Sequence, residues 1–348
     1  MALYSSGTAV VGSLPYLSFV VTSRNDNHGG RLLFRMQTFV DCLADQCNRY
    51  QLPSELVLVE WNPPPNQPQL AEALRWPKPG SSSVRIIQVS AEIHQRFEHS
   101  DKLGLYQMRA KNAGIRRAEA PFVLATNVDI LFSDELMGFL ASKCLRQDRM
   151  YRIDRCDVPA DVPEGVPVTQ LLEFCRRNVT RIHTRWGSID AKTGRYADGA
   201  PPWKAIIGDF CGALTGRPRE KRLHTNASGD FTLLSKETWF KIRGYPELAA
   251  LSVHIDGLGC QTAYYSGVRE QILAPPMQIY HIEHSADCSS KPEGDGALMA
   301  RADSEIPQLP YSEYREIAIR MRRECRPILL NQDNWGLQDH GLREQRVC

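Results

Sequence analysis

The sequence is poor in the features that mark membrane, zinc-binding and nucleic-acid-binding proteins. Its longest apolar runs have the length of a strand, well short of the roughly 20 residues that cross a membrane. Its 10 cysteines form no Cys-x-x-Cys pair, so no cysteine-based zinc site is expected. A formal net charge of +2 offers no basic footprint for nucleic acid. What remains, with 42% hydrophobic and 24% charged residues, is the composition of a globular protein.

The first residues also lack the pattern of a secretion leader. The segment from Met1 to Tyr16 contains no charged stretch followed by a continuous apolar core. We therefore expect a cytoplasmic protein with reduced thiols and no transmembrane segment. Two glycosylation sequons, at Asn178 and Asn226, are then chance matches.

Strand and helix patterns alternate through the first part of the chain. Apolar runs rich in β-branched residues predict strands at 16–22, 56–59, 84–89 and 122–125. Apolar residues at helical spacing predict helices from residue 32, at 70–74 and at 105–117. This alternation predicts an α/β fold, with a Rossmann-like, mostly parallel sheet flanked by helices on both faces. The chain shows no internal repeat and no low-complexity linker, so we expect its 348 residues to form one domain.

The second part of the chain is less regular. Its patterns predict strands at 151–155, 230–234 and 278–284, and helices at 168–178, 236–242, 256–267 and 312–326. Between 182 and 222 the chain is rich in Gly, Pro and Trp and shows little periodicity. A long irregular insert in a compact domain is usually a binding loop or lid, and Trp186 and Trp203 within it offer aromatic faces for stacking on a ligand. The tail beyond Asn331 is polar and indicates nothing specific.

Polar residues follow three of the predicted strands. They are Thr22, Arg24, Asn25 and Asp26 after the first, Glu60 and Asn62 after the second, and Asn127, Val128 and Asp129 after the fourth. The carboxyl ends of parallel strands meet at one edge of the sheet, which is where open α/β sheets bind ligands. Each residue alone could simply cap the sheet edge. Together they favour a site that holds a base and a ribose, with backbone amides on phosphate.

The segment from Met108 to Leu136 resembles the centre of the GT-A glycosyltransferases, especially the family-2-like members. In those enzymes a helix carrying Ala-Arg-Asn-x-Gly precedes a strand that ends in an Asp-x-Asp motif. Here Ala110-Lys111-Asn112-Ala113-Gly114 matches the helix. Asn127-Val128-Asp129 matches the motif with its first Asp replaced. The resemblance extends roughly from Tyr16 to His284, and the residues after His284 lie outside it.

The resemblance implies a GT-A fold and a transfer reaction. Residues 15–140 would bind a nucleotide-diphosphate sugar, with a UDP-sugar favoured. Residues 141–290 would bind a carbohydrate or other hydroxyl acceptor, and residues 291–348 would form a helical extension and tail. Glu60 stands where the family has its uridine-binding acid, and Arg109 and Asn112 would join the donor site.

The resemblance also implies a divalent cation, Mn²⁺ or Mg²⁺, on the donor diphosphate. Such an ion needs only one or two protein carboxylates, because phosphate and water fill its other positions. Asp129 would supply one, and His281 could complete the shell. Because Asn127 carries no charge, we expect weaker metal binding than in an Asp-x-Asp enzyme.

The catalytic base would be Asp256, which stands where inverting members of the family have their catalytic Asp. An acceptor hydroxyl has a very high pKa, so direct displacement requires a positioned carboxylate that takes its proton. Asp230 is the reserve. Asp256 could also cap the helix that follows it, and this role is compatible with catalysis.

The sequence is also compatible with two other functions. A nucleotidyltransferase shares a similar sheet but usually has a Gly-rich loop directly after the first strand, whereas Gly29 and Gly30 come late. A non-catalytic protein that binds carbohydrate or nucleotide would explain Asn127, but the retained Asp129 and Asp256 argue against it. Donor hydrolysis separates the three functions.

Overall fold

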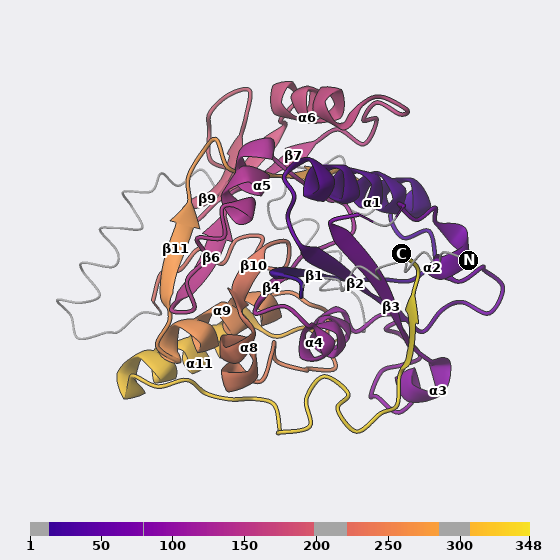
Figure 1. Ribbon diagram of the computed structural model, residues 1–348. Coiled ribbons are helices and arrows are strands. Elements are labelled where there is room, and N and C mark those ends of the chain that lie inside the picture. The colour runs from indigo at the N-terminus through magenta and orange to yellow at the C-terminus, as the bar shows by residue number, and fades with distance from the viewer. Residues whose placement is uncertain (1–13, 79, 198–220, 285–306) are drawn as a thin grey trace, which may run out of the picture.

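A large sheet forms the centre of the molecule. The computed structural model describes residues 14–78, 80–197, 221–284 and 307–348 (Figure 1). In these residues the large sheet has eight strands, in the order β11-β6-β10-β4-β1-β2-β3-β13. Its parallel centre consists of β1 (Leu17–Ser23), β2 (Ser54–Trp61), β3 (Ser82–Val89) and β4 (Phe122–Ala125). The predicted fold class, a mostly parallel sheet flanked by helices, is therefore confirmed.

Strands from later in the chain extend this sheet at both sides. On one side β10 (Thr232–Ser235) runs antiparallel to both β4 and β6 (Arg149–Ile153), and β11 (Arg269–Leu273) runs parallel to β6. On the other side β13 (Arg343–Arg346) runs antiparallel to β3. As β10 lies directly beside β4, the loop before β10 reaches the same sheet edge as the residues after β4.

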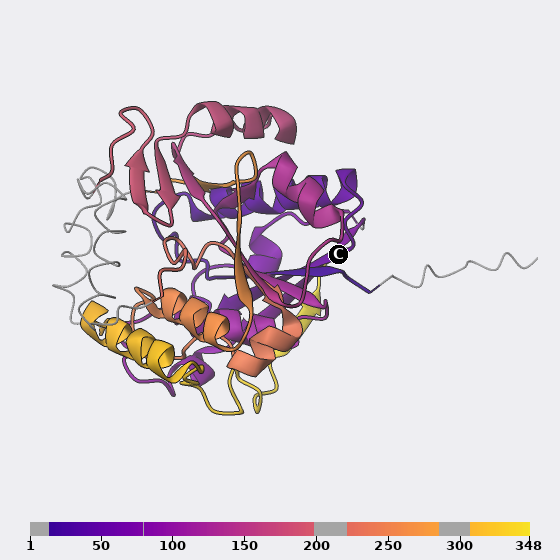
Figure 2. The ribbon, with the colours of Figure 1, turned by 90° about the vertical axis from the view of Figure 1, so that its left-hand side faces the viewer.

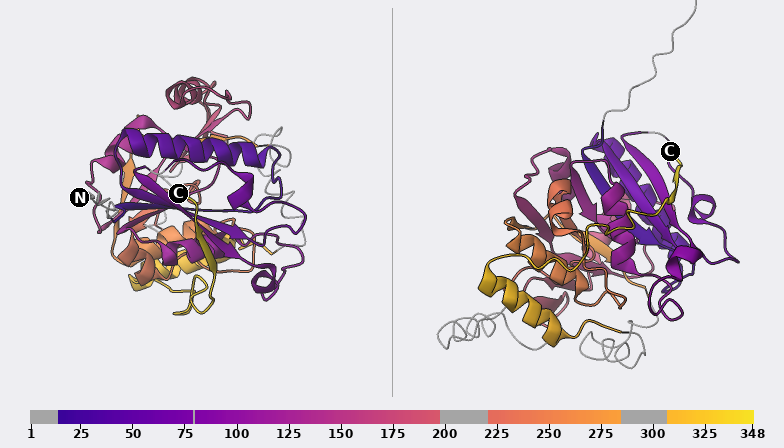
Figure 3. Two further views of the ribbon diagram at one scale, coloured as in Figure 1. Left: turned by 45° about the vertical axis from the view of Figure 1, so that its right-hand side comes forward. Right: turned by 90° about the horizontal axis from the view of Figure 1, so that it is seen from below.

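Helices cover both faces of the sheet (Figure 1 and Figure 3, left). One face carries α1 (Leu32–Arg49) and α5 (Asp134–Ala141), and the other carries α4 (Gln107–Arg117), α8 (Lys236–Ile242) and α9 (Ile255–Tyr265). Side chains alternate along β1, so Phe19 and Val21 join the core beneath α1 while Val20 joins the core beneath α4. Burial on both faces explains why the strands read as nearly continuous apolar runs.

The small residues of α4 let this helix approach the sheet closely. A Cβ atom at Gly114 would lie 2.6 Å from Cγ1 of Val20 and 3.0 Å from Cγ2 of Val59, closer than atoms can pack. Larger side chains at this position would push the helix away. The glycine of the predicted motif thus has a packing reason in this chain.

A second sheet crosses the molecule beside the first. Within the described residues it contains β5 (Ile130–Phe132), β12 (Ile279–Ile282), β7 (Arg155–Val158), β8 (Arg181–Thr184) and β9 (Gly187–Asp190), in that order. The single strand expected at 151–155 is in fact two strands, because the chain passes from β6 to β7 at Asp154. The helix α6 (Val168–Arg177) packs on this second sheet.

Among the described residues the remaining helices are short, apart from one near the C-terminus. The short ones are α2 (Leu70–Ala73) and α3 (Ala91–His94). The long one is α11 (Tyr311–Glu324), which lies beside α9 (Figure 2, yellow and orange). No helix in the described parts of the chain combines the length and apolar character needed to cross a membrane.

The C-terminal tail is an ordered strap that crosses the molecule to β13 (Figure 3, right). Arg117 donates to the carbonyl oxygens of Gly336 and Leu337, both at 2.8 Å. Arg85 contacts Glu344 at 3.1 Å. The polar sequence of this tail indicated no specific role. In the structure its last strand covers the edge of β3 that would otherwise be unpaired.

Candidate active site

One carboxylate and two imidazoles gather just beyond β4. Oxygen and nitrogen atoms of Asp129, His281 and His284 all lie within 4.8 Å of one another. Nε2 of His284 is 3.3 Å from Oδ2 of Asp129, and Nε2 of His281 is 3.9 Å from the same atom. Carboxylate oxygen and imidazole nitrogen are common ligands of transition-metal ions. These three residues, called the Asp-His-His group below, could therefore hold a metal ion.

Strand pairing brings the Asp-His-His group together. His281 in β12 lies opposite Ile130 in β5, directly after Asp129. The backbone N–H of Ile282 also donates to the carbonyl oxygen of Asp129 at 3.0 Å. The predicted pair Asp129 and His281 is thus held by main-chain hydrogen bonds between segments far apart in sequence.

Sequence reasoning did not assign His284 to the metal. In a strand over 278–284, alternation would place His284 on the opposite face from His281. The strand instead ends at Ile282, so the chain is free to turn and direct both imidazoles to Asp129. The spacing His-Ile-Glu-His contains both histidines, but whether the second one reaches Asp129 depends on where β12 ends.

The Asp129 carboxylate has the properties of a metal ligand. It is 8% exposed, and among the described residues its buried Oδ1 has no hydrogen-bond partner. Burial alone would disfavour its charged form. The hydrogen bond from His284 and the charge of His281 outweigh burial and hold the pKa of this carboxyl well below its usual range. A buried, charged oxygen without a donor fits a bound cation.

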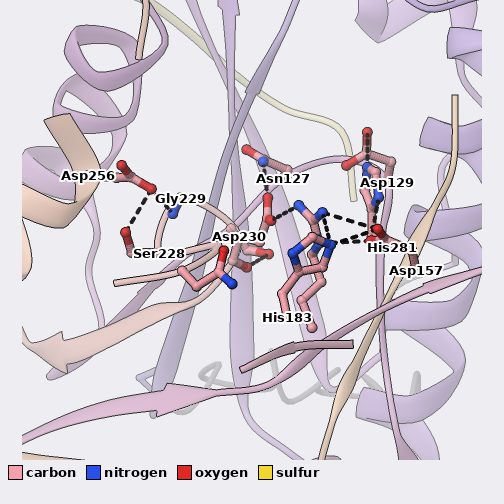
Figure 4. Close-up of polar contacts among 12 residues, drawn as sticks. Asn127, Asp129, Asp157, His183, Ser228, Gly229, Asp230, Asp256 and His281 are labelled. Atoms are coloured by element: carbon pink, nitrogen blue, oxygen red, sulfur yellow. Dashed lines mark hydrogen bonds and ion pairs between the residues drawn. The ribbon is translucent and has the colours of Figure 1, made fainter. Parts of the chain in front are cut away.

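A second carboxylate orients His281. Nδ1 of His281 lies 3.2 Å from Oδ1 of Asp157 in β7, which leaves Nε2 directed toward Asp129 (Figure 4). Burial lowers the pKa of His281, but the hydrogen bond with Asp157 and the nearby carboxylate charges raise it overall. Carboxylate–histidine pairs of this kind fix ring orientation and increase basicity in metal sites. Asp157 also contacts Nε2 of His183 at 2.8 Å, so it is itself held in place.

The loop after β1 lies against the Asp-His-His group. Gly29 has a φ of +67°, and a Cβ atom there would lie 2.4 Å from Nδ1 of His284. Nη2 of Arg35 donates to the carbonyl oxygen of His28 at 2.7 Å, while its Nε lies 3.9 Å from Oδ2 of Asp129. The late glycines of this loop therefore permit a close approach to the candidate metal ligands.

Asn127 has a different role from the residue it replaces in the motif. Its Oδ1 accepts a hydrogen bond from Gln107 at 3.0 Å, and its Nδ2 donates to Oδ1 of Asp230 at 2.5 Å (Figure 4). A carboxylate at this position would face Asp230 and repel it. His284 offers a further candidate ligand where the motif has lost one, and the expectation of weaker metal binding stays a prediction.

Asp256 is held by three hydrogen-bond donors at the start of α9. Its Oδ2 accepts from Oγ of Ser228 at 2.7 Å and from the N–H of Gly229 at 2.5 Å, and its Oδ1 accepts from the N–H of Gly257 at 2.9 Å. A carboxylate can accept about four hydrogen bonds, so one lone pair remains on Oδ1. The helix begins at Ile255 with His254 as its N-cap residue, so the expected capping role of Asp256 is wrong, while its remaining lone pair stays available to a proton.

Asp230 is more committed to the protein. Its Oδ2 forms an ion pair with Nη1 of Arg155 at 2.7 Å, and its Oδ1 accepts from Asn127. In the view of Figure 4, Asp230 lies between Asp256 on one side and the Asp-His-His group on the other. Both carboxylate oxygens of Asp230 are thus engaged by neighbouring side chains. The geometry therefore favours Asp256 over the reserve, Asp230.

Lys111 is a buried lysine for which the sequence predicted no role beyond its place in the helix motif. It is fully buried, and its Nζ donates to the carbonyl oxygen of Gly229 at 2.6 Å. Burial lowers the pKa of Lys111 to about 8, and the charges of Asp230 and Asp256 oppose this shift. The lysine thus supports the loop that carries Asp230 and that donates a hydrogen bond to Asp256.

The residues predicted at the ends of β1 and β2 lie at the same sheet edge. Their side chains mostly fasten neighbouring loops. Three of them donate to carbonyl oxygens: Thr22 to Val59 at 3.0 Å, Asn25 to Pro68 at 2.9 Å and Asn62 to Gly104 at 3.4 Å. Arg24 and Asp26 form an ion pair at 3.5 Å. Oε1 of Glu60 accepts from the N–H of Leu70 at 2.8 Å. Burial raises the pKa of Glu60. Any contact with a nucleotide would depend on these loops as much as on the side chains.

Three predicted site residues are directed elsewhere. The fully buried amide of Asn112 bonds the N–H and carbonyl oxygen of Tyr245, each at 2.8 Å, and Arg109 pairs with Glu247 at 3.1 Å. Val128 is part of the apolar core. Asn112 and Arg109 fasten α4 to the turn that follows α8, and the expected part of the three residues in a donor site stays a prediction. Of the predicted insert, Trp186 lies over Arg185 and Arg222, while Trp203 lies outside the described residues.

No protein-family model and no curated protein matches the chain. In structure it is similar to TarS 1–349 of S. aureus in complex with UDP-GlcNAc, with 13% identity and a TM-score of 0.43, over 78% of this chain and 59% of that chain. A second structure of TarS 1–349 has 14% identity and a TM-score of 0.41, over 76% of this chain and 60% of that chain. GalNAc-T7 with UDP, GalNAc and Mn²⁺ has 11% identity and a TM-score of 0.45, over 94% of this chain and 54% of that chain.

The chain spans less than two thirds of each of these structures. At these identities and TM-scores the likeness concerns the fold alone and carries no argument about function.

Proposed function

We propose that the protein is a glycosyltransferase that moves a sugar from a nucleotide-diphosphate donor, preferably a UDP-sugar, to a hydroxyl acceptor. The observation that carries the proposal is the Asp-His-His group at the carboxyl edge of the parallel strands, with a second carboxylate, Asp256, at the same edge. Open α/β sheets bind nucleotides at this edge. The transfer requires a cation site for the anionic diphosphate and a carboxylate that takes the proton of the acceptor hydroxyl.

The Asp-His-His group would hold a divalent cation, with Mn²⁺ favoured over Mg²⁺. Mixed carboxylate and imidazole ligands suit Mn²⁺ better than Mg²⁺, which prefers oxygen ligands alone. When bound, such an ion neutralises the charge that develops on a departing diphosphate. Asp157 keeps His281 in its orientation, and Arg35 adds positive charge at 3.9 Å from Asp129.

Asp256 would act as the general base in a single displacement. The acceptor oxygen forms a bond to the anomeric carbon while the bond from that carbon to the diphosphate oxygen breaks. The bonding electron pair leaves with UDP, and the acceptor proton goes to Asp256. Ser228 and Gly229 hold the carboxylate in one orientation throughout. This mechanism inverts the anomeric configuration.

Donor hydrolysis tests the proposed function. We expect at least one of UDP-glucose, UDP-galactose, UDP-GlcNAc and UDP-GalNAc to release UDP slowly in the presence of Mn²⁺, and EDTA to stop this release. A nucleotidyltransferase would instead release pyrophosphate from UTP and a sugar phosphate. A purely binding protein would gain thermal stability from UDP without turning over any donor. Either of these outcomes would replace the proposal.

A substitution of Asp157 tests the positioning of His281. Replacing Asp157 with Asn keeps its shape but removes the charge that orients the ring, so we expect Mn²⁺ affinity to fall by roughly 10–100-fold. Calorimetric titration with Mn²⁺ measures the change. The matched control is Asp154→Asn, which alters another carboxylate–histidine pair, with the buried His224 at 2.9 Å, that shares no residue with the Asp-His-His group. Equal losses in both variants would show that Asp157 serves folding only.

A further inference from the structure

Three aromatic rings form a stack where α9 and α11 begin. The rings of Tyr311 and Tyr314 are stacked, with centroids 5.8 Å apart and planes at 16°. The ring of His254 lies 5.4 Å from that of Tyr311 and 5.8 Å from that of Tyr314. Tyr314 is buried, whereas Tyr311 is 54% exposed. A buried ring and a histidine thus support an aromatic ring that faces solvent.

Backbone contacts place this stack. The N–H of Leu251 donates to the carbonyl oxygen of Pro307 at 2.9 Å, and α11 starts after Pro310. The OH of Tyr314 accepts from Gln261 of α9 at 3.3 Å. The two helices therefore start side by side (Figure 2), and Tyr311 is carried to the first turn of α9 from a part of the chain beyond the family resemblance.

The stack is close to the candidate base. His254 precedes Asp256 by two residues and adopts a left-handed conformation with φ of 64°. Left-handed backbone is uncommon for residues other than glycine, and it tends to persist at functional sites. Tyr314 also packs on the first turn, since a Cβ atom at Gly257 would lie 3.6 Å from its Cε2. Tyr311, His254 and Asp256 thus all belong to one small region at the start of α9.

We propose that Tyr311 and His254 form the platform on which a carbohydrate acceptor lies, with its reactive hydroxyl toward Asp256. The inference rests on the proposed function and names the acceptor class. A tyrosine ring offers an apolar face and a polar edge, which match the apolar face and the hydroxyl rim of a sugar ring. Burial of His254 lowers the pKa of its imidazole, which favours a neutral ring in the stack.

Three variants test the platform. Tyr311→Ala removes the exposed ring and Tyr311→Trp keeps an aromatic face. The control is Phe240→Ala, which removes another partly exposed ring, on α8. The labelled proteins are applied, with UDP and Mn²⁺, to a printed array of neutral oligosaccharides, and hydrolysis of the donor is measured in parallel.

We expect the parent protein, Tyr311→Trp and Phe240→Ala to bind the same glycans. Tyr311→Ala should bind them roughly tenfold more weakly. All four proteins should hydrolyse the donor at the same rate, because the ring does not contact the donor. Unchanged glycan binding by Tyr311→Ala would overturn the platform.

The parallel hydrolysis assay separates this inference from the proposed function. If the parent protein hydrolyses the donor but binds no glycan on the array, the acceptor is not a carbohydrate and the platform is wrong while the proposed function stands. If Tyr311→Ala slows donor hydrolysis as much as it weakens glycan binding, the ring supports the fold of the site and the platform is again wrong.

Discussion

Replacing Asp129 with Ala is expected to abolish Mn²⁺-dependent turnover of the nucleotide-sugar donor. Asp129 supplies the one carboxylate of the Asp-His-His group, and it lies at the carboxyl edge of β4. Without it, the group consists of two imidazoles beside Arg35, which is a poor site for a cation. Loss of an interaction that stabilises charge in a transition state costs on the order of 10²–10³-fold in rate. We expect a loss at the upper end, because both metal affinity and charge stabilisation are affected.

Donor hydrolysis and a calorimetric Mn²⁺ titration measure this effect. The matched control is Asp148→Ala, which removes an exposed carboxylate paired with Arg149 at 2.6 Å, far from any candidate ligand. Circular dichroism establishes that both variants fold. If Asp129→Ala turns over donor at the rate of the parent, with unchanged Mn²⁺ affinity, the candidate metal site has no part in the reaction.

Replacing Asp256 with Asn is expected to cut sugar transfer by at least about a hundredfold while donor binding is retained. The amide preserves the shape of the side chain, and its oxygen can still accept from Ser228 and Gly229. It has no basic lone pair to take the acceptor proton. The loss should therefore fall on kcat, with little change in the KM for the donor.

Two further results would identify another base or another mechanism. If Asp256→Asn is nearly as active as the parent and Asp230→Asn is inactive, the base is Asp230. The anomeric configuration of the product, read by NMR, should be opposite to that of the donor. A product with retained configuration would exclude single displacement with either carboxylate.

The parallel part of the fold was predictable because its signals are local. Runs such as Phe122–Ala125 are apolar, and Gly114 and its small neighbours mark the helix that packs on them. The residues that follow the strands reach one edge as a direct consequence of parallel pairing. Asp129 could therefore be placed from the sequence alone.

The rest of the site depends on pairing between distant segments. β12 lies between β5 and β7, and this register decides which histidines meet Asp129. Nothing local in the sequence states where β12 ends, so His284 was missed. The polar character of Asn112 suggested a ligand contact, although its amide is used to hold Tyr245. Lys111 shows the same limit, since its role follows from the position of Gly229, which comes far later in the chain.

Pulsed EPR of the protein with Mn²⁺ and UDP tests the central claim most directly. In the proposed donor site two imidazole nitrogens and the diphosphate would bind one ion. The spectrum of the parent should therefore show couplings to ¹⁴N and to ³¹P, and Asp129→Ala should show neither at the same Mn²⁺ concentration. A protein that binds UDP with no ¹⁴N coupling, or with the same affinity in EDTA, would contradict the proposed metal-dependent donor site.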